Sequence, residues 1–390
     1  MAKNIIFCAD GTWNKPGDEL DNSEAPSNVF KLFTHLAGKH ISKIHHSELT
    51  GRVTEYEKSL IVDTTVIQIS KYINGVGDSN FKLRQMLGGA FGFGLIERIS
   101  RGYTFISRNY VEGDKIFIVG FSRGAYTARA LAGLIANKGL LARKFNQGED
   151  ESYDMAIRAW FSYREGIKQK SYKSRLQNML TAFTSLKNYF LQNSIDEDDF
   201  IKNISVEAVA VWDTVGALGI PDFEFDDNRA EIRDGFAFAD NALNPKVKRG
   251  FHAVALDEMR LLFTPTLWDK RDGIQQLLFA GAHADVGGGY KEAGLSDIAL
   301  RWMIGMLGDA KVGIQFMETA ANIKGDVAAI AHKEWAKLVG VAGKLGTRDF
   351  KKLTLDGTLQ VHISVQERKA LSAFTQYANA QVSKYNPTNY

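Results

Sequence analysis

Five short β-rich runs constrain the fold of this 390-residue chain more than any other feature. Each run is followed by a glycine-containing or polar turn and then by a pattern typical of a helix. This alternation predicts an α/β fold, with a mostly parallel sheet covered by helices on both faces. The five expected strands are Asn4–Ala9, Val66–Ile73, Lys115–Val119, Val206–Trp212 and Gln276–Ala280.

Two of these runs, IFIV and VEAVAVW, are almost continuously apolar, which is typical of strands buried on both faces. The carboxyl ends of parallel strands meet at one edge of the sheet, where ligands of α/β proteins gather. We therefore expect the turns that follow the five strands to lie at one edge. These turns are DGTWN, NGVGD, GFSRGA, DTVGALG and GAHADVGGGY.

The chain is expected to form one catalytic domain over residues 1–310, followed by a mainly helical extension over 311–390. About ninety residues separate the third and fourth strands, more than one crossover helix needs, so residues from about 140 to 203 are interpreted as a helical insertion. Within it, the apolar stripe of Ser174–Phe190 predicts an amphipathic helix. Packing against the core is the simpler interpretation, and a lid or a peripheral membrane contact is the alternative.

Charge and cysteine content exclude several classes of protein. The 48 basic and 45 acidic side chains leave a net charge of +3, which does not predict nucleic-acid binding. The single cysteine, Cys8, supplies neither a disulfide nor a zinc or iron–sulfur site. No run of about 18 apolar residues predicts a transmembrane segment, and Ile5–Ala9 is too short for a secretory signal. We expect no metal and no organic cofactor.

The pentapeptide Gly120-Phe121-Ser122-Arg123-Gly124 is a G-x-S-x-G motif between an expected strand and an expected helix. That setting is typical of the nucleophile elbow of α/β hydrolases, in which a sharp turn exposes a serine hydroxyl. The flanking glycines permit the turn, and the helix N-terminus favours developing negative charge. We therefore interpret Ser122 as a nucleophile in an α/β-hydrolase-like sheet, the alternative being an ordinary tight turn.

A nucleophilic serine needs a base and an orienting acid, which follow it in α/β hydrolases in the order acid, then histidine. Asp213 at the end of the fourth expected strand fits the acid, and His283 at the end of the fifth fits the base. His252 is the alternative base, but the spacing of FHAVALDEMR suggests a helix that packs through its apolar residues. Asp285 could orient His283, bind a metal or cap the glycine turn.

The turn after the first expected strand, DGTWN, occupies the place from which α/β hydrolases supply a main-chain N–H to the oxyanion hole. Gly11 and Thr12 are the candidates there, beside Asp10, and Arg123 after the serine would supply the second N–H. A plain turn at a strand end is the alternative.

Two other classes of function use the same residues. A catalytically silent binding module would clasp a partner with these turns. A metal-dependent phosphoesterase would use Asp10, Asp213, His283 and Asp285, since hard-metal sites also form at strand ends.

Taken together, the motifs resemble a known family. CADGTWN, NGVGD, GDKIFIVGFSRGAYTARALAGLI, VWDTVGALG, HAVALDE, GAHADVGGGY and LSDIALRWM occur in the same order in the type VI secretion phospholipase effector catalytic domain, an α/β-hydrolase domain first defined as one of unknown function. The resemblance covers about residues 3–305.

The resemblance implies a serine esterase with Ser122 on the nucleophile, and Asp213 and His283 on the acid and base. Its substrates would be phospholipids or other esters, and a non-lipid carboxylesterase is the nearest alternative. Members are made in the bacterial cytoplasm without a signal peptide and secreted into competing cells. The implied partners are therefore the secretion apparatus and an immunity protein.

Overall fold

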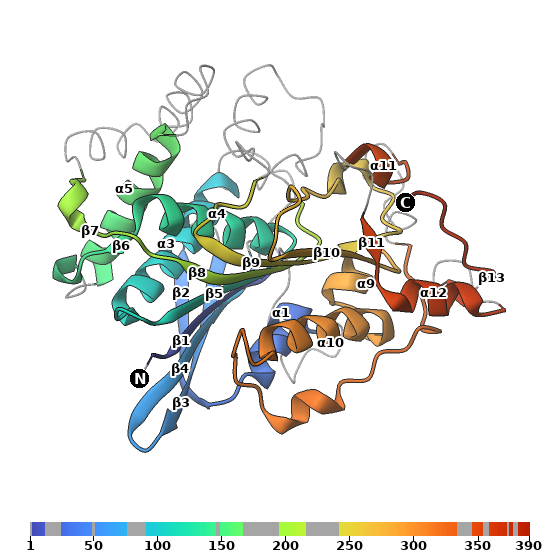
Figure 1. Ribbon diagram of the computed structural model, residues 1–390, viewed down its shortest axis with the longest axis horizontal. Helices are drawn as coiled ribbons and strands as arrows, with labels where there is room; N and C mark the ends of the chain where they lie inside the picture. The colour runs from blue at the N-terminus through green and yellow to red at the C-terminus, as the bar shows by residue number, and fades with distance from the viewer. Residues whose placement is uncertain are drawn as a thin grey trace.

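The structure is a computed structural model that describes residues 2–11, 25–48, 51–75, 91–145, 149–166, 195–215, 242–333, 345–353, 359–372, 374–376 and 381–390. Within these residues, nine strands form one sheet (Figure 1). They are β1 (Asn4–Ala9), β2 (Lys39–Glu48), β3 (Gly51–Val62), β4 (Thr65–Ile73), β5 (Lys115–Phe121), β8 (Val206–Trp212), β9 (Val247–Ala255), β10 (Ile274–Phe279) and β11 (Gln360–Val361).

The order of strands across the sheet is β11-β10-β9-β8-β5-β1-β4-β3-β2. Neighbours from β11 to β4 are parallel, whereas β3 pairs antiparallel with both β4 and β2. The five expected strands all form, as β1, β4, β5, β8 and β10. The predicted α/β fold class, with a mostly parallel sheet, is confirmed.

The central strands are buried on both faces. All six residues of β1 are buried, and its alternate side chains enter two different cores. Ile5 and Phe7 pack in the core on one face, while Ile6 and Cys8 pack in the core on the other. This arrangement follows from the period of two in a strand, and it explains why the sequence of a central strand is apolar throughout.

The prediction for the segment around His252 was wrong, because this segment forms strand β9 rather than a helix. β9 lies between β8 and β10 and pairs in parallel with both. Its residues from Gly250 to Ala255 are all buried. A strand covered on both faces has no polar–apolar alternation, so its sequence resembles that of a buried helix.

Helices cover both faces of the sheet (Figure 1). On one face, α3 (Phe91–Asn109), α4 (Arg123–Lys138) and α5 (Glu149–Gly166) pack in the core that contains Ile5 and Phe7. On the other face, α1 (Asn28–His35) and α10 (Gly294–Gly308) pack around Ile6 and Cys8. The predicted coverage on both faces is therefore present.

The region between β5 and β8 contains α4, α5 and a short antiparallel pair, β6 (Leu140–Leu141) with β7 (Phe200–Ile201). Two 3-10 helices, η2 (Arg143–Phe145) and η3 (Glu197–Asp199), flank this pair. The amphipathic helix expected over Ser174–Phe190 lies outside the described residues. The choice between a core helix and a lid therefore stays a prediction.

The chain after α10 returns to the β10 edge of the sheet. Its elements are η7 (Glu318–Asn322), α11 (Phe350–Leu353), β11, α12 (Ile363–Ala370), β12 (Phe374–Gln376) and β13 (Gln381–Ser383). Phe350, Val365 and Tyr385 pack there with Val254 of β9 and Leu278 of β10. This region therefore shares a core with the last strands of the sheet.

Residues 317–333 contain less helix than we expect for the mainly helical extension over 311–390. Their helical content is the 3-10 helix η7, and the remainder up to residue 333 is turns, bends and extended chain. The guanidinium of Arg368 accounts for part of this difference, because it donates to the carbonyls of Val327 and Ala329. The two carbonyl groups are therefore hydrogen-bonded by Arg368 and do not need the main-chain N–H groups of a helix.

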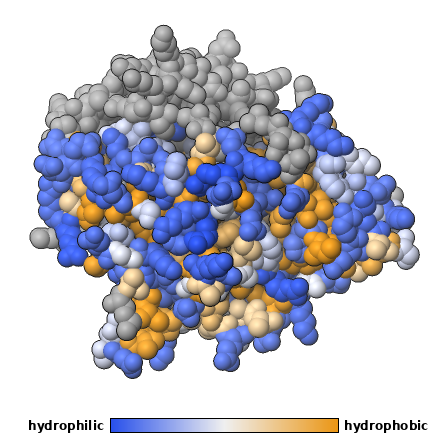
Figure 2. Space-filling view, viewed as in Figure 1, coloured by the Kyte–Doolittle hydropathy of each residue, from blue (hydrophilic) through white to orange (hydrophobic). Residues whose placement is uncertain are grey.

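The β3–β4 hairpin projects from the body of the molecule (Figure 1), and Figure 2 shows apolar surface at this place. Ile61, Val62 and Val66 are 57%, 46% and 37% exposed. The turn residues Asp63 and Thr64 have φ values of 47° and 68°, as a two-residue type I′ hairpin requires. The tip therefore presents three aliphatic side chains to solvent.

Candidate active site

Ser122 occupies the sharp turn between β5 and α4. Its φ of 57° and ψ of −119° are those of the first central position of a type II′ turn, which glycine normally fills. Its N–H donates to the carbonyl of Trp212 on β8 at 3.1 Å, which ties the turn to the neighbouring strand. A non-glycine residue in this conformation is strained, and such strain is concentrated at functional sites.

The two glycines of the motif are required by close backbone contacts. A Cβ atom on Gly120 would lie 2.3 Å from the carbonyl oxygen of Gly124. A Cβ atom on Gly124 would lie 2.1 Å from the carbonyl oxygen of Ala9. Since both neighbours are main-chain atoms, neither can move aside easily, so the G-x-S-x-G spacing is fixed by packing.

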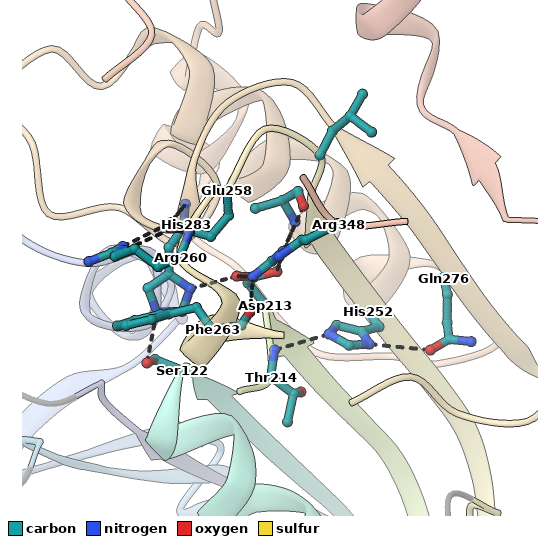
Figure 3. Close-up of polar contacts among 12 residues, drawn as sticks. Ser122, Asp213, Thr214, His252, Glu258, Arg260, Phe263, Gln276, His283 and Arg348 are labelled. Carbon is teal, nitrogen blue, oxygen red and sulfur yellow. Dashed lines mark hydrogen bonds and ion pairs between the residues drawn. The ribbon is translucent and has the colours of Figure 1, made fainter. Parts of the chain in front are cut away.

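The structure brings Ser122, His283 and Asp213 into direct contact (Figure 3). The Oγ atom of Ser122 lies 2.8 Å from Nε2 of His283, and Nδ1 of His283 lies 2.6 Å from Oδ2 of Asp213. An ionised carboxylate only accepts hydrogen bonds, so Nδ1 carries the proton and Nε2 accepts from the serine hydroxyl. This is the arrangement of a nucleophile, a base and an orienting acid. The catalytic roles themselves stay a prediction.

Three elements deliver these side chains to one edge of the sheet. Ser122 follows β5, Asp213 follows β8, and His283 begins the short helix α9 (His283–Gly287) after β10. Asp213 has a φ of 36°, so its backbone also departs from the strand conformation. The polar turns that follow these three strands therefore meet at one edge, as parallel strands require.

Burial and the surrounding charges set the protonation states. Burial lowers the pKa of His283 below its usual value, although the hydrogen bond and charge of Asp213 oppose that shift. The pKa of Asp213 is held well below its usual range, because the charge of Arg348 and the hydrogen bond from His283 outweigh its burial. A neutral imidazole beside an ionised carboxylate is the state in which a histidine can accept a proton.

Two rings and an ion pair surround His283. The ring of Phe121 lies 4.6 Å from the imidazole, and the ring of Phe263 in the 3-10 helix η6 (Leu261–Phe263) lies 5.0 Å away, edge-on. Glu258 accepts from the main-chain N–H of His283 at 3.2 Å and pairs with Arg260 through two bonds of 2.8 Å. These contacts fix the start of α9 and the plane of the imidazole.

Sequence reasoning missed Arg348. Its guanidinium donates to both carboxylate oxygens of Asp213, at 2.7 and 2.9 Å (Figure 3). Arg348 follows His283 by 65 residues in a region with few motifs, so no local pattern marks it. Glu258 and Arg260 were also missed, although they lie within five residues of the end of β9, in the polar segment that follows its apolar run.

The structure separates the alternative base, His252, from Ser122. Nε2 of His252 accepts from the N–H of Thr214 at 3.1 Å, and Nδ1 lies 3.3 Å from Oε1 of Gln276 (Figure 3). Burial, and next the charge of Arg129, lowers the pKa of His252 to about 3. His252 is therefore a neutral buried group that joins neighbouring elements of the sheet.

The remaining acids have separate partners. Asp10 accepts from Ser27 and Tyr72 at 2.7 and 2.6 Å. Asp285 accepts from the N–H of Ala282 at 2.9 Å and pairs with Nδ1 of His332 at 2.6 Å. Over the part of the chain that the structure describes, no three His, Cys, Asp or Glu side chains are grouped so that they could hold a metal ion. Asp10, Asp213, His283 and Asp285 therefore form no such group.

The candidate oxyanion donors are only partly described. Arg123 begins α4 directly after Ser122, where main-chain N–H groups point out of the helix. The N–H of Gly11 donates to the carboxylate of Asp10 at 2.7 Å. Thr12 lies outside the described residues.

Among the helices in the described ranges, none is both long and apolar enough to cross a membrane.

Comparisons with known proteins give one family. The model of the family described as type VI secretion system phospholipase effector Tle1-like, catalytic domain, matches residues 3–306. An uncharacterized protein of Saccharomyces cerevisiae is 27% identical over 270 residues, which are 67% of this chain and 33% of that protein.

Two solved structures are similar over most of this chain. The Tle1 effector bound to the VgrG spike from the type VI secretion system is 20% identical, with a TM-score of 0.36, over 75% of this chain and 52% of that one. An uncharacterized protein from Pseudomonas aeruginosa is 15% identical, with a TM-score of 0.41, over 83% and 49%. The chain thus spans about a third of the yeast protein and about half of each solved chain.

Proposed function

The chain belongs to the family of Tle1-like phospholipase effectors of the type VI secretion system, and on that premise we propose that it is a serine hydrolase that cleaves carboxylic ester bonds. The observation that carries the proposal is the chain of hydrogen bonds from Asp213 through His283 to Ser122. It ends on a serine whose backbone is held in a strained turn. A silent binding module needs neither feature.

The reaction follows from the atoms in contact. Nε2 of His283 takes the hydroxyl proton as Oγ of Ser122 attacks the ester carbonyl, and Asp213 stabilises the imidazolium that forms. The imidazolium then gives its proton to the leaving alcohol, which leaves an acyl-serine. Water, deprotonated by His283, releases the carboxylic acid and restores Ser122.

The negative charge of the tetrahedral intermediate needs main-chain donors. We assign the N–H of Arg123 as the first donor, because it follows Ser122 at the N-terminus of α4. The turn at Gly11 and Thr12 is the second. The hydrogen bond from Gly11 to Asp10 has to open before Gly11 can donate to a substrate.

Phospholipids are the substrates that we propose, on the strength of the family. By the same reasoning, the protein is made in a bacterial cytoplasm and delivered into target cells, with the secretion apparatus and an immunity protein as partners. The catalytic domain that we propose comprises residues 1–310. A non-lipid carboxylesterase would use the same residues and differ only in substrate.

A fluorophosphonate probe tests the serine chemistry, because it labels only an activated serine. We expect wild-type protein to be labelled and Ser122→Ala to show background only. In parallel, turnover is measured on vesicles of several phospholipids and on short p-nitrophenyl esters. Ser122→Ala should lose about 10³-fold or more on every ester that the wild type cleaves. If the variant keeps a tenth of the wild-type rate, Ser122 is not the nucleophile.

The same assays separate the rival functions. A silent binding module predicts no labelling and no turnover. A metal-dependent phosphoesterase predicts that a chelator abolishes activity, whereas a serine hydrolase keeps its activity with the chelator present. Cleavage of short esters but not of vesicles would identify a non-lipid carboxylesterase.

A further inference from the structure

The carboxylate of Asp213 has more partners than a simple Ser–His–Asp arrangement requires. His283 donates to Oδ2 at 2.6 Å, and the N–H of Ala255 donates to Oδ1 at 2.9 Å. Arg348 adds a bidentate pair, with Nη1 on Oδ1 at 2.7 Å and Nη2 on Oδ2 at 2.9 Å (Figure 3). The side chains of Arg348 and Asp213 are 2% and 0% exposed, so solvent screens this pair little.

The guanidinium of Arg348 is itself held in one orientation. Nη1 donates to the carbonyl of Ala255 at 2.7 Å, and Nη2 donates to the carbonyl of Phe263. The main-chain carbonyl of Arg348 accepts from the side-chain amide of Asn389 at 2.9 Å. The same amide donates to the carbonyl of Leu256 at 3.0 Å, just beyond β9. Arg348 is thus fixed at both its backbone and its head group.

These contacts connect two parts of the chain that are far apart in sequence. Arg348 and Asn389 both lie beyond residues 3–306, which match the family model. Asp213 and His283 lie within that range. The surroundings of the proposed acid are therefore completed from outside the matched region.

We propose that Arg348 is a positioning residue for the reaction: its planar fork fixes the plane of the Asp213 carboxylate, so that Oδ2 faces Nδ1 of His283, and its charge keeps that carboxylate ionised. The inference rests on the proposed serine-hydrolase function. A bidentate arginine–carboxylate pair supplies geometry as well as charge, and lysine cannot reproduce that geometry.

The charge of Arg348 also has a predictable effect on His283. Arg348 shares Oδ2 with the imidazole, so it draws on the negative charge that stabilises the imidazolium. The other charged groups at this place are Glu258 and Arg260, which pair with each other, while His252 is neutral on β9. Removing the positive charge of Arg348 should therefore raise the pKa of His283.

The test compares Arg348→Met with Arg348→Lys in the full chain. The measurement is the second-order rate of fluorophosphonate labelling at Ser122 as a function of pH, which needs no knowledge of the natural substrate. For Arg348→Met we expect the plateau rate to fall about tenfold or more, because small misplacements of reacting groups are costly. We also expect the acidic limb of the profile to move up by about one pH unit. Arg348→Lys should keep the wild-type limb with a lowered plateau.

Arg368→Met is the matched control for a buried arginine with a structural role. Arg368 is buried, and its head group donates to the carbonyls of Val327 and Ala329. We expect this variant to lower the melting temperature without moving the acidic limb. Asn389→Ala, which keeps the charge of Arg348 but frees its backbone, should lower the plateau and leave the limb in place.

Each outcome decides the inference. A folded Arg348→Met protein with the wild-type plateau and limb overturns it, while labelling of the wild type leaves the proposed function standing. If the limb moves equally in Arg348→Lys, the argument from charge is wrong. If Arg348→Met does not fold, unchanged labelling in both Arg348→Lys and Asn389→Ala overturns the inference. An unlabelled wild type overturns the proposed function, and this inference with it.

Discussion

The backbone of Ser122 permits a test that separates strain from chemistry. Ser122→Ala and Ser122→Gly both remove the hydroxyl and its hydrogen bond to His283. Ser122 is the N-cap of α4, but its side chain makes no capping hydrogen bond, so neither variant loses a cap. The two variants therefore differ only in how easily they adopt a φ of 57° and a ψ of −119°.

The expected difference can be worked out from two opposing contributions. A non-glycine residue in this conformation is strained by about 2 kcal/mol, and glycine is not. Glycine also gains conformational entropy in the unfolded chain, which lowers stability by about 0.7 kcal/mol relative to alanine. Ser122→Gly should thus be more stable than Ser122→Ala by about 1.3 kcal/mol.

Urea unfolding of both variants measures this difference as a shift in midpoint at equal slope. Ser100 offers a matched control, because it is a fully buried serine inside α3 whose hydroxyl has no hydrogen-bond partner in the described residues. There the order should reverse, with Ser100→Gly less stable than Ser100→Ala by about 1 kcal/mol. If Ser122→Gly is also the less stable of its pair, the turn is not strained and the reasoning fails.

Two further predictions concern titratable groups. His283→Ala should reduce turnover as far as Ser122→Ala does, and the double variant should be no slower, because members of one catalytic unit are not additive. His252→Ala should lower stability and leave the hydrogen bonds from Asp213 through His283 to Ser122 in place. If His252→Ala is inactive and His283→Ala is active, His252 and not His283 is the base. Burial raises the pKa of Asp257 to about 6. The carboxyl group of Asp257 therefore stays protonated in the folded chain at pH values at which it has lost its proton in the unfolded chain, where its pKa is about 4. As the pH rises from about 4 to about 6, the free energy of unfolding of the wild type should therefore fall by about 3 kcal/mol relative to that of Asp257→Asn. If urea unfolding gives the same difference in free energy between the two proteins at pH 4 and at pH 7, this prediction is wrong.

The parts of the site that could be predicted are those that the sequence encodes locally. The turn at Ser122 needs glycine at Gly120 and Gly124, and five consecutive residues carry that requirement. Asp213 and His283 each follow a strand, and parallel strands bring their carboxyl ends to one edge. Strand order along the chain and the position after each strand were therefore sufficient to name these residues.

The parts that could not be predicted depend on contacts between distant segments. Arg348 contacts Asp213 only because the chain returns to the β10 edge of the sheet. No local sequence pattern near Arg348 predicts this contact. His252 was assigned to a helix because β9 is covered on both faces and so lacks alternation. The antiparallel strands β2 and β3, which extend the sheet beyond β4, lie outside the five expected strands.

The contact between Arg348 and Asp213 also sets an order in time. A ribosome makes Ser122, the proposed nucleophile, first, then Asp213 and His283, and Arg348 after them. At about 5–20 residues per second, Ser122 is made some tens of seconds before the ion pair between Arg348 and Asp213 can form. A growing chain that has not reached residue 348 therefore contains Ser122, Asp213 and His283 without the guanidinium that we propose orients the carboxylate of Asp213.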